Sequence, residues 1–335
     1  MKNAKNETVL LIVMVVVVAI ISMINSQFLT VYNLFDLLRS SITDGFFAIG
    51  VMIVMISGGI DISFPAIGAF AMYTTTIIFN TLEYEGSILL PMITAMLIGI
   101  ALGSMNALFI HVFHIPTFIA TLGTQNIICG ILLTFIGSDA IMRLPDGFTA
   151  FSKSSLITVP AQVGKSSLPS AIILLIVISI IAWFILNHTM LGRGVYAIGG
   201  NPVAAQRVGF HVGLIQLFIY CFAGGVAGIS GLTHTCLVRT SNPFDIIGTE
   251  LTIIAAVVLG GTSISGGKGS VRGTLLGVFM ITIISNSLIM VGISTYWQRA
   301  VLGFLIILSV SIAAFQGKRG LSAKKVRRAG EHAQQ

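Results

Sequence analysis

The chain has 335 residues, of which 55% are hydrophobic and only 9% are charged, and its mean hydropathy is +1.00. An average soluble domain carries roughly 25% charged residues, so a soluble fold is excluded and the sequence predicts an all-α polytopic membrane protein. The net charge of +7 then reports membrane orientation, and we expect no nucleic-acid partner.

Ten apolar stretches of near-spanning length follow one another along the chain. They lie at residues 8–27, 42–57, 64–80, 88–113, 117–136, 169–187, 213–238, 248–263, 273–291 and 298–315. Because 42–57 and 248–263 run into glycine clusters, each is predicted to be either a continuous span or a broken or re-entrant one. The first stretch lacks a small-x-small cleavage site, so we interpret it as an uncleaved span.

The distribution of basic residues orients these ten spans. Twelve of the 18 lysines and arginines fall on the side of the two termini, and this excess places the N- and C-termini in the cytoplasm. The predicted organisation is a cytoplasmic N-terminus at 1–7, a transmembrane domain at 8–316 and a basic cytoplasmic tail at 317–335.

Glycine patterns recur along the chain. SGGIDIS at 57–63 and LGGTSIS at 259–265 each end an apolar stretch and precede another, at an offset of 202 residues. They indicate either a parallel internal repeat or a chance similarity between glycine-rich helix ends. Pairs of glycines four residues apart predict helix-packing notches at Gly99/Gly103, Gly224/Gly228 and Gly273/Gly277.

The sequence contains no cluster that fits an enzyme active site or a metal centre. His111 and His114 are three residues apart but have no acidic or cysteine partner nearby. The segment 260–270 fails as a phosphate-binding loop, because Thr262 replaces the first glycine and Gly269 replaces the residue that would hold magnesium. We therefore expect a tight turn there, or alternatively a ligand contact, and predict no catalytic residue, metal site or cofactor.

Polar residues within or beside the apolar stretches are candidates for a solute pathway. Asp61 either lines such a pathway or lies at the cytoplasmic headgroup level, solvated or capping the next helix. Gln125, Asn126 and Asn286 lie in mid-span, where their amides can bind solute hydroxyls or join neighbouring helices.

The segment LGRGVYAIGGNPVAAQRVGF, at 191–210, separates two long apolar stretches and contains two arginines and no acid. Its Gly-Gly-Asn-Pro break places Asn201 to cap a short helix that Pro202 begins. Small alanines in that helix allow close docking, and its arginine can meet an acidic partner. The residues predicted to form this protein-binding surface are Gly199, Gly200, Asn201, Pro202, Ala204, Ala205 and Arg207.

Five blocks of sequence together resemble the permease subunits of bacterial ABC-type simple-sugar importers, the group for ribose, galactofuranose and related autoinducers. The blocks are GGIDIS (58–63), IPTFIATLGT (115–124), the segment 191–210, ELTIIAAVVLGGTSISGGKGS (250–270) and GTLLGVF (273–279). The resemblance runs from about residue 30 to residue 315. Phe64-Pro65 stand where the family has Val-Gly, a bulkier and kinked entry to the next helix.

The resemblance implies a multi-pass protein of the bacterial inner membrane that imports a simple sugar or sugar-like solute. It implies cytoplasmic ABC ATPase subunits that use the ATP, a periplasmic or lipid-anchored sugar-binding protein, and a second permease subunit in a homo- or heterodimer. The segment 191–210 then matches the family's coupling segment, which docks on the ATPase. The alternative is an ion-coupled secondary transporter, for which only Asp61 and Glu250 are candidate intramembrane acids.

Overall fold

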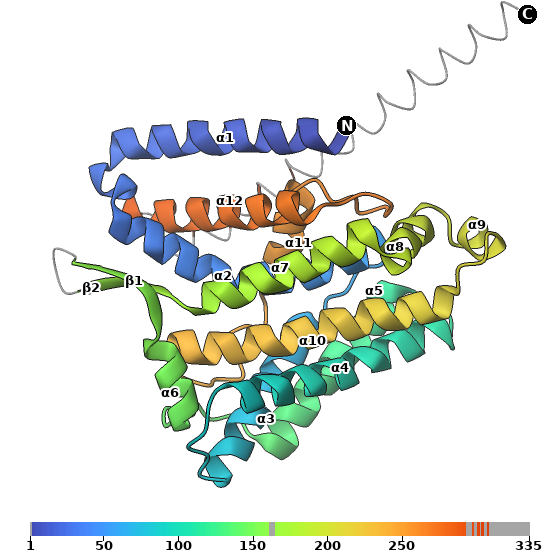
Figure 1. Cartoon of the computed structure of the whole chain (residues 1–335), viewed down its shortest axis with the longest axis horizontal. Helices are drawn as coiled ribbons and strands as arrows, with labels where there is room; N and C mark the ends of the chain where they lie inside the picture. The colour runs from blue at the N-terminus through green and yellow to red at the C-terminus, as the bar shows by residue number, and fades with distance from the viewer. Residues whose placement is uncertain are drawn as a thin grey trace, which may run out of the picture.

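The structure is a computed structural model that describes residues 2–160 and 165–292 and six further positions between 297 and 307. Helices dominate these ranges, and Figure 1 shows most of them running side by side along the long axis. The helices are α1 (Lys2–Ile24), α2 (Val31–Ile56), α3 (Phe64–Thr81), α4 (Leu89–His111), α5 (Thr117–Ile131), α6 (Asp146–Lys153), α7 (Ala171–His188), α8 (Met190–Gly200), α9 (Pro202–Arg207), α10 (Val212–Val238), α11 (Glu250–Leu259) and α12 (Val271–Met290), with a 3-10 turn η1 (Ser26–Leu29) and a π turn η2 (Leu132–Ile136).

Seven helices in the described ranges are long and apolar enough to cross a membrane, which fits a multi-pass membrane protein. They are α1 from Glu7 onward, α2, α4, α5 extended by η2, α7, α10 and α12. The predicted span 64–80 is the helix α3, which has 18 residues, as many as α7. It carries three consecutive threonines, is less apolar than α7 and is not among the seven. Apart from isolated positions, the predicted tenth span at 298–315 lies outside the described residues, and so does the whole basic tail at 317–335.

The two uncertain spans resolve in opposite ways. The segment 42–57 belongs to the continuous helix α2, which begins at Val31 and includes Arg39. Polar residues at the start of α2 had lowered the apparent hydropathy there. The segment 248–263 is broken, because α11 has only 10 residues and is about 15 Å long, half of the roughly 30 Å hydrocarbon core.

The all-α prediction is wrong between α6 and α7, where two strands form an antiparallel hairpin. β1 (Ser155–Pro160) pairs with β2 (Lys165–Pro169). Isoleucine, threonine and valine follow one another in β1, and such β-branched residues favour strands. Because the strand is short and largely exposed, it has no apolar face long enough to stand out in a hydropathy pattern. The hairpin marks one end of the bundle, which we call the hairpin end (Figure 1).

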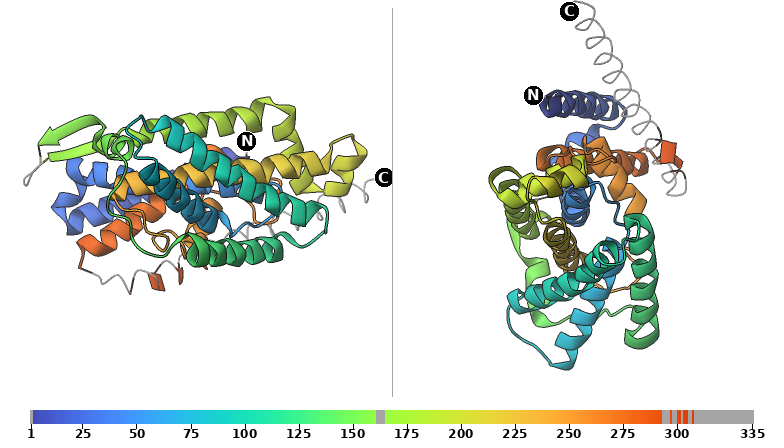
Figure 2. Two further views of the ribbon diagram at one scale, coloured as in Figure 1. Left: turned by 90° about the horizontal axis from the view of Figure 1, so that it is seen from below. Right: turned by 90° about the vertical axis from the view of Figure 1, so that its right-hand side faces the viewer.

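The core of the bundle forms around α2 and α10. Of the spanning window in α2, 72% of the residues are buried, against 6% in α1. α10 packs on α4, α3 and α2, whereas α1 packs chiefly on α12. The end-on view in Figure 2 accordingly shows α1 outside the main body of the bundle.

Glycines allow the backbones of α4 and α10 to touch. A methyl group added at Gly99 would lie 2.1 Å from the carbonyl oxygen of Gly224, and one added at Gly228 would lie 2.1 Å from that of Ala95. Gly103 makes a similar approach to α10. These contacts confirm the predicted packing notches. The third predicted notch also packs closely on a neighbouring helix, here α12 on α11, through Gly273 and Gly277.

We expect the variant Gly99→Ala to unfold at a lower temperature than the native chain. Overpacking a tight contact costs about 1–3 kcal/mol, and the atoms that would be hit belong to backbone. Gly123→Ala is the matched control, because a methyl group there meets nothing within 4 Å. Thermal unfolding in detergent measures both variants, and equal midpoints would contradict the close contact.

Candidate functional site

Three segments that are far apart in sequence meet at the end of the bundle opposite the hairpin, which we call the α9 end (Figure 1). They are the chain after α2, the junction of α8 and α9, and the loop 260–270. The amide of Gly267 donates to the carbonyl oxygen of Ile56 (2.8 Å), and the hydroxyl of Tyr196 donates to that of Gly269 (2.9 Å). Burial raises the pKa of the Tyr196 phenol, so it stays protonated and can donate at neutral pH.

Gly199, at the end of α8, lies at the centre of this meeting point. A methyl group there would lie 1.8 Å from the carbonyl oxygen of Ile56 and 2.6 Å from the amide nitrogen of Gly267. Gly58 and Gly266 flank the contact with φ angles of +86° and +79°, which favour glycine. The chain after α2 and the loop 260–270 therefore lie against each other beside α8, while the internal repeat stays a prediction.

The predicted short helix in 191–210 is confirmed as α9. Pro202 is its first residue, and the side-chain oxygen of Asn201 accepts from the amide of Ala204 (3.0 Å), as a helix cap does. Arg207 is exposed in the last turn. Local capping chemistry therefore determines where the chain turns out of α8 and begins a new helix.

One part of the predicted surface is wrong. Ala205 is 3% exposed and packs in the core, so only Ala204 of the two alanines faces outward. Two apolar residues that the sequence analysis missed are exposed instead, Val203 at 58% and Val208 at 75%. The sequence signal for these exposed residues was a pair of valines, five residues apart, at the two ends of a short capped helix.

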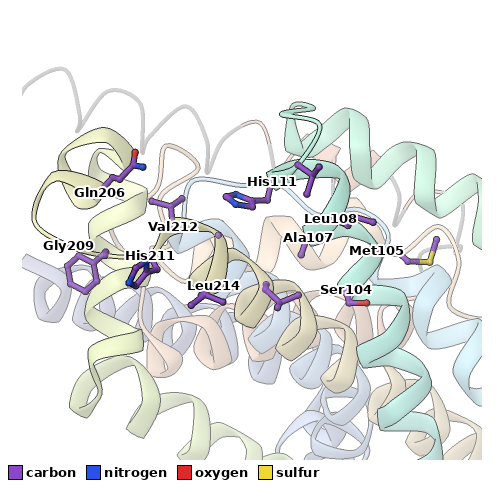
Figure 3. Close-up of a pocket in the computed structure, with 14 residues that line it drawn as sticks. Ser104, Met105, Ala107, Leu108, His111, Gln206, Gly209, His211, Val212 and Leu214 are labelled. Carbon is purple, nitrogen blue, oxygen red and sulfur yellow. The ribbon is translucent and has the colours of Figure 1, made fainter.

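A groove of about 890 Å³ lies beside α9, between the end of α4 and the start of α10 (Figure 3). Its walls are mostly apolar and include Leu108 and Leu214. The imidazole of His111 hydrogen-bonds the side chain of Gln216 (3.1 Å) at its edge. Neither His111 nor His114 belongs to a metal-binding group, since none exists among the described residues.

Asp61 begins a buried chain of hydrogen bonds. Its carboxylate accepts from the amide and the hydroxyl of Ser63 (2.7 and 2.6 Å), and Asn106 donates to the Ser63 hydroxyl (2.7 Å). Thr124 donates in turn to Asn106 (2.6 Å). Asp61 is only 2% exposed, so the predicted solvated position is wrong, and the carboxylate instead organises the chain that enters α3.

Threonines on one face of α5 hold the irregular residues 57–63 in place. Thr117 accepts from the amide of Ile60 (3.1 Å), and Thr121 accepts from the amide of Ile62 (3.3 Å). With Thr124 these threonines follow an i, i+4, i+7 spacing, a signal that the sequence analysis did not use. The loop between α2 and α3 is therefore fixed by α5 and is not a solvated turn.

The remaining candidate pathway residues do not join this network. Gln125 donates to the Glu250 carboxylate (2.8 Å), linking α5 to the start of α11. Asn126 is exposed and donates to the carbonyl oxygen of Leu122 (2.8 Å). The side-chain oxygen of Asn286 on α12 is buried, with no hydrogen-bond partner among the described residues.

The fold is that of a multi-pass membrane protein whose capped surface helix is tied to its central span, an arrangement that fits a membrane transport permease. The chain belongs to the family of the permease component of the branched-chain amino acid transport system, whose family model matches residues 33–310. Curated relatives that are sugar import permeases confirm the resemblance seen in the sequence.

Curated relatives cover nearly the whole chain. The ribose import permease protein RbsC of Escherichia coli (strain K12) is 30% identical over 90% of this chain and 92% of its own length. The galactose/methyl galactoside import permease protein MglC of the same strain is 29% identical, with 92% and 94% covered. The probable ABC transporter permease protein YphD is 30% identical, with 96% and 93% covered. No solved structure matches the chain.

Proposed function

We propose that this chain is the membrane-spanning permease subunit of an ATP-binding-cassette importer for a simple sugar or sugar-like solute. The observation that carries the proposal is the α8–α9 junction, where an exposed capped helix is locked onto the end of the central span α2. Relatives named as ribose and galactose/methyl galactoside import permeases support the solute class. The same relatives favour an ATP-driven importer over an ion-coupled secondary transporter.

The proposed assembly places the α9 end in the cytoplasm of a bacterial inner membrane. Ser270 donates to Glu7 (2.6 Å), so the start of α1 and the loop 260–270 share this end, in agreement with the positive-inside assignment. Ten crossings with both termini cytoplasmic, including the span 298–315 and the tail 317–335, are part of the proposal. A periplasmic or lipid-anchored binding protein then delivers solute at the hairpin end.

Movement of the ATPase subunits enters through the segment 191–210. ATP binding closes the ATPase dimer and displaces α9, whose rigid cap at Asn201 passes the displacement to α8. Because Gly199 touches both Ile56 and Gly267, α2 and the loop leading to α12 move together. A tightly packed contact of this kind transmits a rigid-body shift without absorbing it.

A second permease subunit is proposed to cover the face formed by α5 and α11. Gln125, Asn126 and Glu250 place amides and a carboxylate there, and Asn126 is exposed. Polar and charged groups that face lipid at membrane depth are costly, which favours a partner or a solute pathway on this face. The partner is a second copy or a related permease, and Asn286 remains a further pathway candidate. Asp61 acts by positioning the entry to α3.

Reconstitution tests the proposed function. The permease, its ATPase and its binding protein are placed in liposomes, and uptake of radiolabelled D-ribose and D-galactose is measured with and without internal ATP. We expect uptake of at least one sugar that requires ATP and the binding protein. Uptake driven by an ion gradient in liposomes without the ATPase would contradict the proposal.

Aspartate at the exposed valines of α9 tests the docking surface. We expect Val203→Asp and Val208→Asp each to lower the affinity for the ATPase tenfold or more, because burying a valine contributes about 1.5–3 kcal/mol. Copurification of the ATPase and its stimulation by binding protein measure the effect. Leu82→Asp, at an exposed leucine of the opposite end, is the control, and equal ATPase recovery in all three variants would contradict docking at α9.

A further inference from the structure

A second cavity, of about 290 Å³, lies at the hairpin end between α2, α10 and the irregular segment 239–249. Arg39 and Ser40 are exposed at its mouth, and Phe47 is a buried wall. Asp44, His234 and Asp245 also line it. None of these residues belongs to the network at the α9 end.

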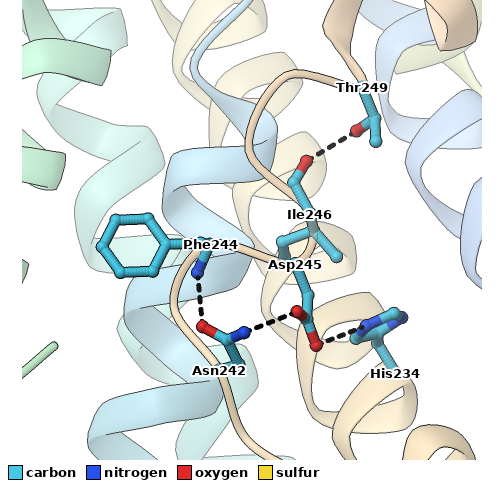
Figure 4. A network of polar contacts seen from close by, with 6 residues as sticks. All are labelled: His234, Asn242, Phe244, Asp245, Ile246 and Thr249. Atoms are coloured by element: carbon cyan, nitrogen blue, oxygen red, sulfur yellow. Dashed lines mark hydrogen bonds and ion pairs between the residues drawn. The ribbon is translucent and has the colours of Figure 1, made fainter. Parts of the chain in front are cut away.

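The segment 239–249 is folded so that Asp245 faces α10 (Figure 4). The Asp245 carboxylate lies 3.6 Å from the His234 ring and accepts from the side chain of Asn242 (2.8 Å). Asn242 accepts in turn from the amide of Phe244 (3.1 Å), and Thr249 donates to the carbonyl oxygen of Ile246 (2.7 Å). The acidic side of the cavity is thus held in place by its own loop.

The opposite wall carries a carboxylate without a partner. Asp44 lies within α2, and it makes no hydrogen bond or ion pair with any described residue. One guanidinium N–H group of Arg39 donates to the carbonyl oxygen of Leu237, which leaves the other N–H groups free for a ligand. An acid within a membrane span is normally paired or functional, so an unpaired Asp44 beside a cavity indicates a missing ligand.

We propose that this cavity is a solute subsite that takes a neutral polyhydroxyl molecule of monosaccharide size. Carboxylates accept and a guanidinium donates, so together they satisfy hydroxyls that both donate and accept, while the ring of Phe47 offers an apolar surface. The volume of about 290 Å³ lies just below the roughly 300–1,000 Å³ of small-molecule sites. The acids and histidine here do not form a metal-binding group among the described residues.

This subsite rests on the proposed function and extends it toward the binding-protein side. Thr249 lines the cavity, and the next residue, Glu250, accepts from Gln125 on α5. Because Thr249 and Glu250 are consecutive, the start of α11 joins the wall of the cavity to the polar contact with α5. The cavity is the entry to the pathway, and the Glu250–Gln125 contact is its next step.

Conservative substitutions in the reconstituted transporter test the subsite. We expect Asp44→Asn and Asp245→Asn to lower uptake tenfold or more and to change the ratio of the two sugars, while stimulation of the ATPase by binding protein stays within twofold. Asp139→Asn is the control, because this exposed acid lies outside the cavity and only its carbonyl oxygen is bonded, to Tyr73. Unchanged uptake and sugar ratio in both variants would overturn the subsite.

Cysteine protection provides a second measurement that does not depend on those variants folding. Ser40→Cys is made in a chain whose Cys129, Cys221 and Cys236 are replaced by alanine, and it is labelled with a membrane-impermeant maleimide. We expect an excess of the transported sugar to slow labelling severalfold. The subsite would be overturned if the sugar gave no protection, or if sodium or magnesium alone protected the cysteine. Failure of the native transporter to take up any sugar with ATP would instead overturn the proposed function.

Discussion

A Gly199→Ala variant will lose both stability and transport, because the new methyl group has no space. It would lie 1.8 Å from the carbonyl oxygen of Ile56 and 2.6 Å from the amide nitrogen of Gly267. Both atoms belong to backbone, so the segments must separate, and the hydrogen bond between them (2.8 Å) breaks. Overpacking alone costs about 1–3 kcal/mol, and loss of the hydrogen bond adds about 0.5–1.5 kcal/mol.

The neighbouring glycine is the matched control. At Gly200 an added methyl group meets nothing within 4 Å, so Gly200→Ala is expected to unfold like the native chain and is the control for stability. Thermal unfolding, sugar uptake and ATPase stimulation are measured on both variants. The proposed transmission requires that Gly199→Ala lower uptake more than it lowers ATPase binding; native uptake in this variant would exclude it.

The contrast between these two glycines shows which part of the site the sequence can predict. The helix α9 was predictable because its signals are local: Asn201 caps, Pro202 begins the helix, and the glycines before them end α8. The contact of Gly199 with Ile56 and Gly267 joins residues far apart in the chain. No local pattern distinguishes Gly199 from Gly200, and only the packing of α8 against α2 does so.

The same distinction explains the outcome for the fold. Long apolar helices such as α4 and α10 were predictable from hydropathy alone. The early start of α2 was missed because its first residues include Asp36 and Arg39, which lower the hydropathy before residue 42. The short α11 showed only as a glycine-flanked apolar run. The polar groups of the cavity at the hairpin end were missed because three separate elements, α2, α10 and the segment 239–249, bring them together.

Replacing Asp61 by alanine is expected to destabilise the chain strongly. The amide and hydroxyl of Ser63 both lose their acceptor within a site that is at most 2% exposed. Each buried donor left unsatisfied costs about 1–3 kcal/mol, and Asn106, which bonds the same hydroxyl, loses its orientation. We expect a lower unfolding temperature and loss of uptake in Asp61→Ala, with Asp139→Ala, at an exposed acid, as the control.

Asp61→Asn separates the two roles that an acid at this depth can have. The amide oxygen of asparagine can accept both bonds from Ser63, so a positioning role predicts that Asp61→Asn keeps most of the native stability and ATP-dependent uptake. If the carboxylate charge held a coupling ion, the asparagine variant would fail as completely as the alanine variant. Thr124→Val extends the comparison, because it removes the 2.6 Å bond to Asn106 without changing any charge. A positioning network predicts that Thr124→Val is more damaging than Asp61→Asn, whereas an ion site predicts the reverse order.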